Sequence, residues 1–161
     1  MDVKQTLKKL CAVGAPSGFN EPAAQVASEL LRPLMDEVYV DRLGSVIGVR
    51  RCGKENAGKL VFDAHLDEIG LIVTGIEEGF LRFRAIGGVD PRILPDREVT
   101  VLAERPMPGV VVCLPPHILT PEEREKSVPI AELFIDVGLS QERAQELIPI
   151  GTPIVYREGA F

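Results

Sequence analysis

The chain has 161 residues, of which 45% are hydrophobic and 26% are charged, a composition typical of a folded globular protein and not of a disordered one. Its formal net charge of -6 excludes the strongly basic surface that a nucleic-acid-binding protein uses to neutralise phosphates, so we expect no nucleic-acid partner. The longest apolar runs are far shorter than the roughly 20 residues that cross a bilayer, so we expect no membrane partner either.

The N-terminus and the cysteines both favour a cytoplasmic protein. The segment "MDVKQTLKKLCAV" carries an acidic residue, Asp2, and no continuous apolar core, which does not fit a signal peptide. Cys11, Cys52 and Cys113 are an odd number of cysteines at wide spacing, which fits neither a disulfide framework nor a C-x-x-C zinc site. We therefore expect free thiols in a reducing cytoplasm.

Apolar residues at helical spacing predict two helices at the start of the chain. The first runs from Val3 to about Cys11. For the second, Asn20 offers its side chain as an N-cap ahead of Pro22, and apolar residues continue at helical spacing to about Leu34.

Three strands are expected after these helices. The segments 37–41 and 45–51 are predicted to pair around a turn at Gly44, and a polar loop then leads into "KLVFDAH", residues 59–65. The continuous apolar run "LVF" indicates a strand covered on both faces, as in the sheet of an α/β layer structure.

From residue 70 onward, short strands separated by Gly and Pro predict a small barrel or sandwich. A hairpin is expected over 70–88 with its turn at "EEG", residues 77–79. One helix over 140–147, with Ser140 as its N-cap, interrupts the β-rich part. The other strands are expected over 97–104, 107–114, 131–138 and 152–156.

These elements indicate two domains with a boundary between Asp67 and Gly70. Residues 1–66 would form an α/β domain and residues 67–161 a β-rich domain. The first is small for an independent α/β domain, because small domains bury proportionally less surface. We therefore expect residues 1–66 to be part of a larger sheet structure.

The segment "DAHLDE" is the best candidate for a functional site. In an extended chain Asp63, His65 and Asp67 lie on one face, at the carboxyl end of the predicted strand, where α/β sheets usually bind ligands. An imidazole is a common metal ligand, and its second nitrogen generally donates to a carboxylate, a role that the spacing gives to Asp67. The alternative is a structural histidine beside acids that are simply solvated.

His117 and Asp136 are weaker candidates. His117 follows two prolines in a predicted loop without nearby acidic residues, so we interpret it as a structural loop histidine. Asp136 has apolar neighbours on both sides in "LFIDVG"; it is either a buried acid of a site or, more simply, an anchor for the following turn.

Two pairs of glutamates are better explained by structure than by catalysis. Glu77 and Glu78 precede Gly79 in a predicted turn, and Glu122 and Glu123 follow a proline at a predicted helix start, where acids are favoured by the helix dipole. There is no G-x-S-x-G nucleophile motif and no glycine-rich phosphate loop.

Five ordered blocks resemble the first half of the tetrahedral aminopeptidases, which are cocatalytic metallopeptidases also labelled glutamyl aminopeptidases or, mistakenly, cellulases. The blocks are "LCAVGAPSGFNEP", "DRLGSVIG", "DAHLDEIGLIVTGIEEGFLRFRAIGG", "LPPH" and "LFIDVGLSQERAQELIPIGTPIVY". The resemblance implies that His65 binds one of two divalent metal ions and that Asp67 supports it. It also implies the opening part of a zinc-peptidase-like α/β sandwich, followed by an inserted β-barrel-like dimerisation domain.

The resemblance further implies an enzyme that removes N-terminal residues from peptides with two zinc or cobalt ions, which activate water and polarise the scissile carbonyl. In that family the other metal ligands and the general base follow the part matched here. This chain is therefore expected to hold at most one weak, partial metal site, to be inactive alone, and to self-associate into dimers or higher oligomers. The alternatives are a non-catalytic assembly module and one half of a split enzyme.

Overall fold

The computed structural model describes residues 2–157, which form two compact units, one ending at Glu68 and the other beginning at Ile69. The last four residues of the predicted second domain, 158–161, lie outside this described part. No helix within residues 2–157 is long and apolar enough to cross a membrane.

Two helices open the first unit. Helix α1, Val3–Cys11, begins at Asp2, whose side chain accepts a hydrogen bond from the backbone N–H of Gln5 at 3.2 Å. Helix α2 spans Glu21–Leu31. Both helices were predicted.

Two details of α2 differ from the prediction. Asn20 occupies the N-cap position, but its side chain makes no capping hydrogen bond. The helix also ends at Leu31, not at Leu34. Pro33 has no N–H to continue the helical ladder, and the backbone N–H of Leu34 instead bonds to the carbonyl of Leu31 at 2.9 Å in a tighter turn.

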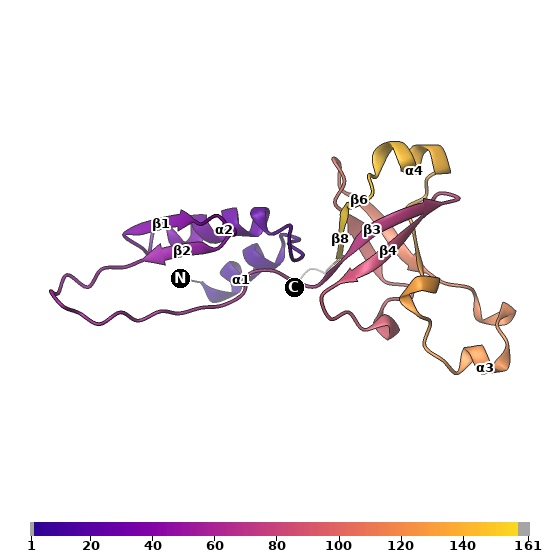
Figure 1. Ribbon diagram of the computed structural model, residues 1–161, viewed down its shortest axis with the longest axis horizontal. Coiled ribbons are helices and arrows are strands. Elements are labelled where there is room, and N and C mark those ends of the chain that lie inside the picture. Colours follow the sequence, from indigo (N-terminus) through magenta and orange to yellow (C-terminus); the bar gives the residue numbers. More distant parts are fainter. Residues whose placement is uncertain (1, 158–161) are drawn as a thin grey trace. The chain divides into compact units, whose positions relative to one another are not determined.

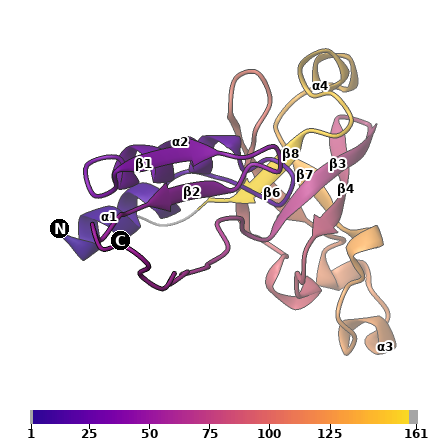
Figure 2. The same cartoon turned by 60° about the vertical axis from the view of Figure 1, so that its left-hand side comes forward.

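A β-hairpin completes the regular part of this unit. Strands β1, Glu37–Val40, and β2, Val46–Val49, pair antiparallel. Asp41 shapes the turn, because its Oδ1 accepts hydrogen bonds from the backbone N–H groups of Leu43 and Ser45, both at 2.9 Å. Figure 1 and Figure 2 both place this hairpin along α2.

The predicted strand over residues 59–65 is absent. Leu60, Val61 and Phe62 lie in an irregular segment with 80%, 81% and 90% of their surface exposed. A strand covered on both faces needs neighbouring strands for its backbone hydrogen bonds and layers for its side chains. Within residues 2–157 no strand pairs with this segment, so the prediction was wrong for this structure.

The second unit is built on a closed barrel of six strands, which decides between the two architectures left open by the sequence. The strand order is β3-β4-β7-β6-β5-β8, and β8 pairs with β3 to close the barrel. Closure leaves no unpaired strand edge. The strands are β3 Gly70–Glu77, β4 Phe80–Ile86, β5 Glu98–Val101, β6 Met107–Val112, β7 Phe134–Asp136 and β8 Pro153–Tyr156.

The hairpin of β3 and β4 turns where the sequence predicted. Glu78 and Gly79 have φ angles of +52° and +89°, a left-handed conformation that glycine adopts without strain. Gln141 holds this turn, because its Oε1 accepts from the backbone N–H of Gly79 at 2.9 Å and its Nε2 donates to the carbonyl of Ile76 at 3.2 Å.

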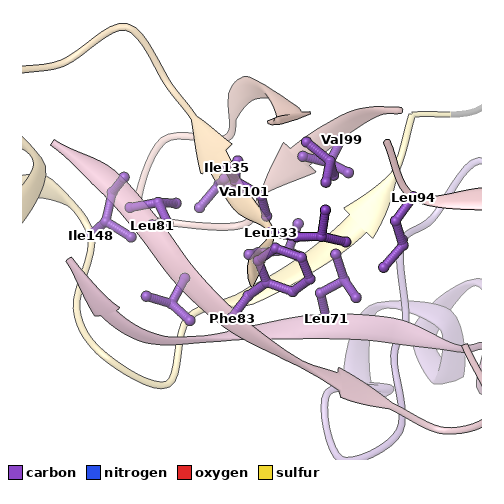
Figure 3. Packing of buried hydrophobic residues seen from close by; sticks show 12 residues of the cluster. Leu71, Leu81, Phe83, Leu94, Val99, Val101, Leu133, Ile135 and Ile148 are labelled. Carbon is purple, nitrogen blue, oxygen red and sulfur yellow. The ribbon is translucent and has the colours of Figure 1, made fainter. Parts of the chain in front are cut away.

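The barrel interior is apolar. Successive side chains of each strand point alternately into and out of a barrel, and those that point inward fill its core. Leu81 and Ile135 are fully buried at a directly opposed pair of β4 and β7, and they lie close together in Figure 3. The buried cluster comprises Leu71, Val73, Leu81, Phe83, Leu94, Val99, Val101, Val111, Leu133, Ile135, Ile148 and Ile154.

Short helices occupy the connections between the strands. Helix α4, Gln141–Leu147, begins at Ser140, whose hydroxyl accepts from the backbone N–H of Arg143 at 3.4 Å, so the predicted N-cap is confirmed. Both views place α4 and α3, Pro121–Arg124, on opposite sides of the barrel. Three 3-10 turns complete the connections: Pro91–Ile93, Pro116–Ile118 and Ile130–Glu132.

Candidate functional site

His65 and Asp67 lie together in the first unit, although no strand forms there. The Nδ1 atom of His65 is 2.8 Å from the backbone carbonyl oxygen of Asp67 and 3.3 Å from its carboxylate Oδ1. Both of these oxygens are acceptors, so the neutral ring fits here with its proton on Nδ1. The His65 side chain is 86% exposed, which leaves Nε2 as the nitrogen available to a ligand.

Asp67 is held on its other side by Ser17. The Ser17 hydroxyl donates to Oδ2 of Asp67 at 2.5 Å. This hydrogen bond is the main cause that keeps the pKa of the Asp67 carboxyl below its ordinary value; His65 contributes less, and partial burial opposes the effect. The carboxylate is therefore ionised at neutral pH and has both oxygens next to partners.

Backbone pairing brings these two segments together. The N–H of Glu68 donates to the carbonyl of Ala15 at 3.0 Å, and the N–H of Ser17 donates to the carbonyl of Glu68 at 3.3 Å. The Glu68 side chain adds a third bond, because its Oε1 accepts from the N–H of Ala15 at 3.0 Å. Residues Pro16 and Glu68 thus form an isolated parallel bridge.

The expected face of three side chains is realised only in part. His65 and Asp67 meet, whereas Asp63 lies exposed in the irregular segment before them. In the described part of the chain, no group of three or more His, Cys, Asp or Glu side chains could hold a metal ion. His65 with its partner Asp67 fits one position of a metal site and not a complete one, because catalytic zinc generally takes three protein ligands.

The two weaker candidates have structural settings. His117 lies exposed in the 3-10 turn Pro116–Ile118 of the second unit. Asp136 is exposed at the end of β7, and its Oδ1 accepts from the backbone N–H of Gly138 at 2.8 Å. The turn-anchoring interpretation of Asp136 is therefore confirmed, and the alternative of a buried acid was wrong.

The glutamate pairs also have structural positions. Glu77 ends β3 and bonds to Arg82 at 2.9 Å, which lowers the pKa of its carboxyl. Glu78 lies in the hairpin turn. Glu122 lies in the first turn of α3, as predicted, and the side chain of Glu123 lies outside the described part. The three cysteines are free, as expected.

A cavity of about 700 Å³ lies elsewhere in the first unit, between α2 and the hairpin turn. Its lining includes Ser28, Arg32, Asp41, Arg42 and Leu43. Neither His65 nor Asp67 lines it, so the cavity is not part of the candidate site.

Sequence reasoning missed the role of Ser17 and Glu68. Ser17 belongs to the block "LCAVGAPSGFNEP" and Glu68 ends the segment "DAHLDE", and neither motif indicates a long-range contact. Their partners lie about fifty positions away along the chain: Asp67 is 50 positions after Ser17, and Glu68 is 53 positions after Ala15. No local pattern could identify such contacts.

Two curated relatives of this chain are named lysyl and glutamyl aminopeptidase. It is 35% identical over 155 residues to the lysyl aminopeptidase of Pyrococcus furiosus, covering 92% of this chain and 44% of that protein. It is 27% identical over 155 residues to the glutamyl aminopeptidase of Lactococcus lactis, covering 94% of this chain and 43% of that protein. The chain thus spans less than half the length of these relatives.

Solved structures of a TET aminopeptidase and a TET1 peptidase also resemble this chain. A TET aminopeptidase from a marine-sediment archaeon of the Thaumarchaeota superposes with a TM-score of 0.84 and 36% identity, over 95% of this chain and 43% of that one. The TET1 peptidase of Pyrococcus horikoshii superposes with a TM-score of 0.78 and 34% identity, over 97% of this chain and 47% of that one. The profile of the M42 glutamyl aminopeptidase family matches residues 44–160, and this chain belongs to that family.

Proposed function

We propose that this chain supplies one metal ligand, His65, to a dinuclear-metal aminopeptidase that removes N-terminal residues from peptides. The observation that carries the proposal is the His65 ring itself. Its Nδ1 faces the carbonyl and carboxylate oxygens of Asp67, and its side chain, which carries Nε2, is 86% exposed. Metal-binding histidines typically have this arrangement, in which an oxygen acceptor fixes the ring and makes the free nitrogen a better donor.

The chemistry is divided between the metal ions and the protein. Divalent ions such as zinc or cobalt would supply Lewis-acid activation of the scissile carbonyl and of a water molecule. His65 would hold one ion through Nε2. Asp67 would act as a positioning residue, because it touches the imidazole and not the reacting atoms. The peptide substrate class follows from the names of the relatives, which are lysyl and glutamyl aminopeptidases.

We infer that the 161 residues alone are catalytically incomplete. Within residues 2–157 no group of three or more His, Cys, Asp or Glu side chains could hold a metal ion, so His65 and its neighbours do not build one full metal site. Two ions about 3.5–4 Å apart require several carboxylate and imidazole ligands. The remaining ligands and the general base would lie in the part of the relatives that this chain does not match.

The proposal is tested with aminoacyl-anilide substrates and added cobalt or zinc, on protein whose intact mass confirms its length. We expect no turnover by the 161 residues, and equilibrium dialysis should find at most one weakly bound ion per chain. The His65→Ala variant should lose that ion and the His117→Ala variant should keep it. Turnover that disappears in His65→Ala would contradict the inferred incompleteness, and binding unaffected by His65→Ala would contradict the metal-ligand role.

We also propose that the barrel unit mediates self-association, as the dimerisation domain of a subunit whose first unit opens a zinc-peptidase-like sandwich. Two observations support this role. The solved relatives include a dodecamer and a peptidase that assembles into a tetrahedron or an octahedral shell. The barrel unit also exposes several large apolar side chains, namely Ile93, Leu114, Ile118 and Ile150, and burial of such side chains against another subunit would remove apolar surface from water.

Sedimentation tests this assembly role separately from metal binding. We expect a dimer or higher oligomer that persists in the presence of a chelator. A monomer at all concentrations would contradict it. If the chain associates without binding any metal, the non-catalytic assembly module is the better account. Co-purification of a second chain that restores turnover would favour a split enzyme.

A further inference from the structure

Ser17 lies in the loop between α1 and α2, far in sequence from the residues it touches. We propose that Ser17 is a positioning residue: its hydroxyl fixes the Asp67 carboxylate and, through it, the orientation and tautomer of the His65 ring. The inference rests on the proposed role of His65 as a metal ligand, and it adds a residue to the site that no motif in the sequence identified.

The loop that carries Ser17 is fixed by its backbone. Ala15 is 2% exposed, and its N–H and carbonyl both bond to Glu68, the first to the side chain and the second to the backbone N–H, each at 3.0 Å. The N–H of Ser17 bonds to the carbonyl of Glu68 at 3.3 Å. Three hydrogen bonds thus place the Cα of Ser17 beside Asp67 before its side chain makes any contact.

The Ser17 hydroxyl then restricts the rotation of the Asp67 carboxylate. The torsion that rotates a carboxylate about its Cβ–Cγ bond is broad, and the side chain of Asp67 is 39% exposed, so water could compete for either oxygen. The 2.5 Å bond from Ser17 engages Oδ2. The other oxygen, Oδ1, is consequently held 3.3 Å from Nδ1 of His65.

The fixed Asp67 carboxylate influences which nitrogen of the His65 ring carries the proton. With the carboxylate fixed, Nδ1 of His65 faces two acceptors, the carbonyl of Asp67 at 2.8 Å and Oδ1. Both favour the tautomer with the proton on Nδ1, which leaves the lone pair on Nε2. Loss of the Ser17 hydroxyl would free the carboxylate, weaken one of these acceptors and raise the population of the tautomer whose Nε2 carries a proton and cannot bind a metal ion.

The competing explanation is that Ser17 only anchors its loop to the segment 67–68. A purely structural role would change the stability of this contact without changing the ratio of the two His65 tautomers in molecules that remain folded. The tautomer ratio therefore separates the two explanations, and it is measured on the metal-free chain, so it does not depend on any peptidase activity.

The experiment records long-range ¹H–¹⁵N correlations of the histidine rings in the full chain at about pH 8, where an ordinary imidazole is neutral. The His117→Gln substitution identifies the signals of His65. We compare the wild type with Ser17→Ala, Ser17→Thr and the control Thr6→Ala, which removes another exposed hydroxyl of the first unit, bonded to the carbonyl of Asp2.

We expect the wild type to populate mainly the Nδ1–H tautomer of His65. Ser17→Ala should shift the tautomer ratio toward Nε2–H by about threefold or more, the size expected when one hydrogen bond is lost. Ser17→Thr, which keeps a hydroxyl, should restore the wild-type ratio, and Thr6→Ala should leave it unchanged. If Ser17→Ala does not fold, Ser17→Cys gives the same comparison with a weaker donor.

An unchanged tautomer ratio in a folded Ser17→Ala or Ser17→Cys variant would overturn the proposal. A zinc titration of the same samples tests the metal-ligand role of His65 separately from the positioning role of Ser17. If the ratio shifts but zinc does not bind, Ser17 positions Asp67 and His65 is not a ligand. If zinc binds to His65 equally well in wild type and Ser17→Ala while the ratio is unchanged, the ligand role stands and the positioning role of Ser17 is wrong.

Discussion

The Ser17 hydroxyl donates a 2.5 Å hydrogen bond to the carboxylate of Asp67, 50 residues further along the chain. The same carboxylate lies 3.3 Å from Nδ1 of His65. A serine of one loop, an aspartate and an exposed imidazole therefore form one continuous set of contacts.

Replacing Asp67 should weaken metal binding without abolishing it. Asp67→Asn removes the negative charge beside Nδ1 of His65 but keeps the backbone carbonyl at 2.8 Å. Loss of such a partner typically lowers metal affinity about 10-fold or more. Isothermal titration with zinc measures the change.

The matched control for this substitution is Asp63→Asn, which makes the same change at an exposed residue two positions before His65. We expect the control to bind zinc like the wild type. Equal affinities for wild type and Asp67→Asn would mean that the carboxylate does not support the ring.

The hydrophobic interior of the barrel should dominate the stability of the second unit. Leu81 is fully buried opposite Ile135, so Leu81→Ala leaves a cavity that costs about 2–5 kcal/mol in the free energy of unfolding. Ile150 is 72% exposed, and Ile150→Ala should change that free energy by no more than about 0.5 kcal/mol. Chemical denaturation followed by circular dichroism measures both, and comparable losses for the two variants would contradict the assigned core.

The hairpin turn of the barrel should not tolerate a side chain at Gly79. Its φ is +89°, and an added Cβ would lie 2.3 Å from the carbonyl oxygen of Leu139. Gly151 has a similar φ of +91° but open space around it. Both alanine variants carry the strain of a positive φ, about 1 kcal/mol or more, and the steric clash adds a further loss only at Gly79. A Gly79→Ala variant as stable as Gly151→Ala would contradict this packing.

Tyr156 should lower the stability of the second unit through its hydroxyl group. Its buried oxygen has no hydrogen-bond partner among the described residues, and an unpaired buried polar group costs about 1–3 kcal/mol. Tyr156→Phe should therefore raise the free energy of unfolding by about 1 kcal/mol. Tyr39→Phe, at a residue that is 46% exposed, should change it little.

Tyr156 should also make the free energy of unfolding depend on pH. Burial raises the pKa of Tyr156, although nearby Arg97 opposes the shift. Because the pKa of Tyr156 is higher in the folded state than in the unfolded chain, its ionisation leaves the free energy of unfolding unchanged below about pH 10, the ordinary tyrosine pKa, and lowers that free energy as the pH rises above it. Above pH 10, the free energy of unfolding, measured by denaturation at a series of pH values, should fall less steeply with pH for Tyr156→Phe than for the wild type. Identical slopes would contradict the burial of this phenol.

Local patterns in the sequence predicted the elements whose determinants are local. The turn at Glu78 and Gly79 and the N-cap at Ser140 follow from residue types within a few positions, and the structure has both. Asn20 shows the limit of this reasoning, because a residue can occupy a cap position without making the capping hydrogen bond.

Long-range pairing explains what the sequence could not predict. The apolar run from Leu60 to Phe62 has strand character, but a strand forms only if other strands lie beside it, and in residues 2–157 none does. The pairing of Ser17 with Asp67 likewise depends on a backbone bridge between Pro16 and Glu68. For His65 and Asp67 the two-residue spacing was sufficient, because the ring bonds to an adjacent part of its own chain.

The most direct test of the central claim is a zinc titration of the full chain followed through the ring nitrogens of His65 by ¹⁵N NMR. Our account predicts that the Nε2 signal of His65 shifts toward that of a metal-bound nitrogen while Nδ1 keeps its proton, and that His117 does not respond. A response at Nδ1 of His65, a response only at His117, or no response from either ring would contradict the assignment of His65 as a metal ligand held by Asp67.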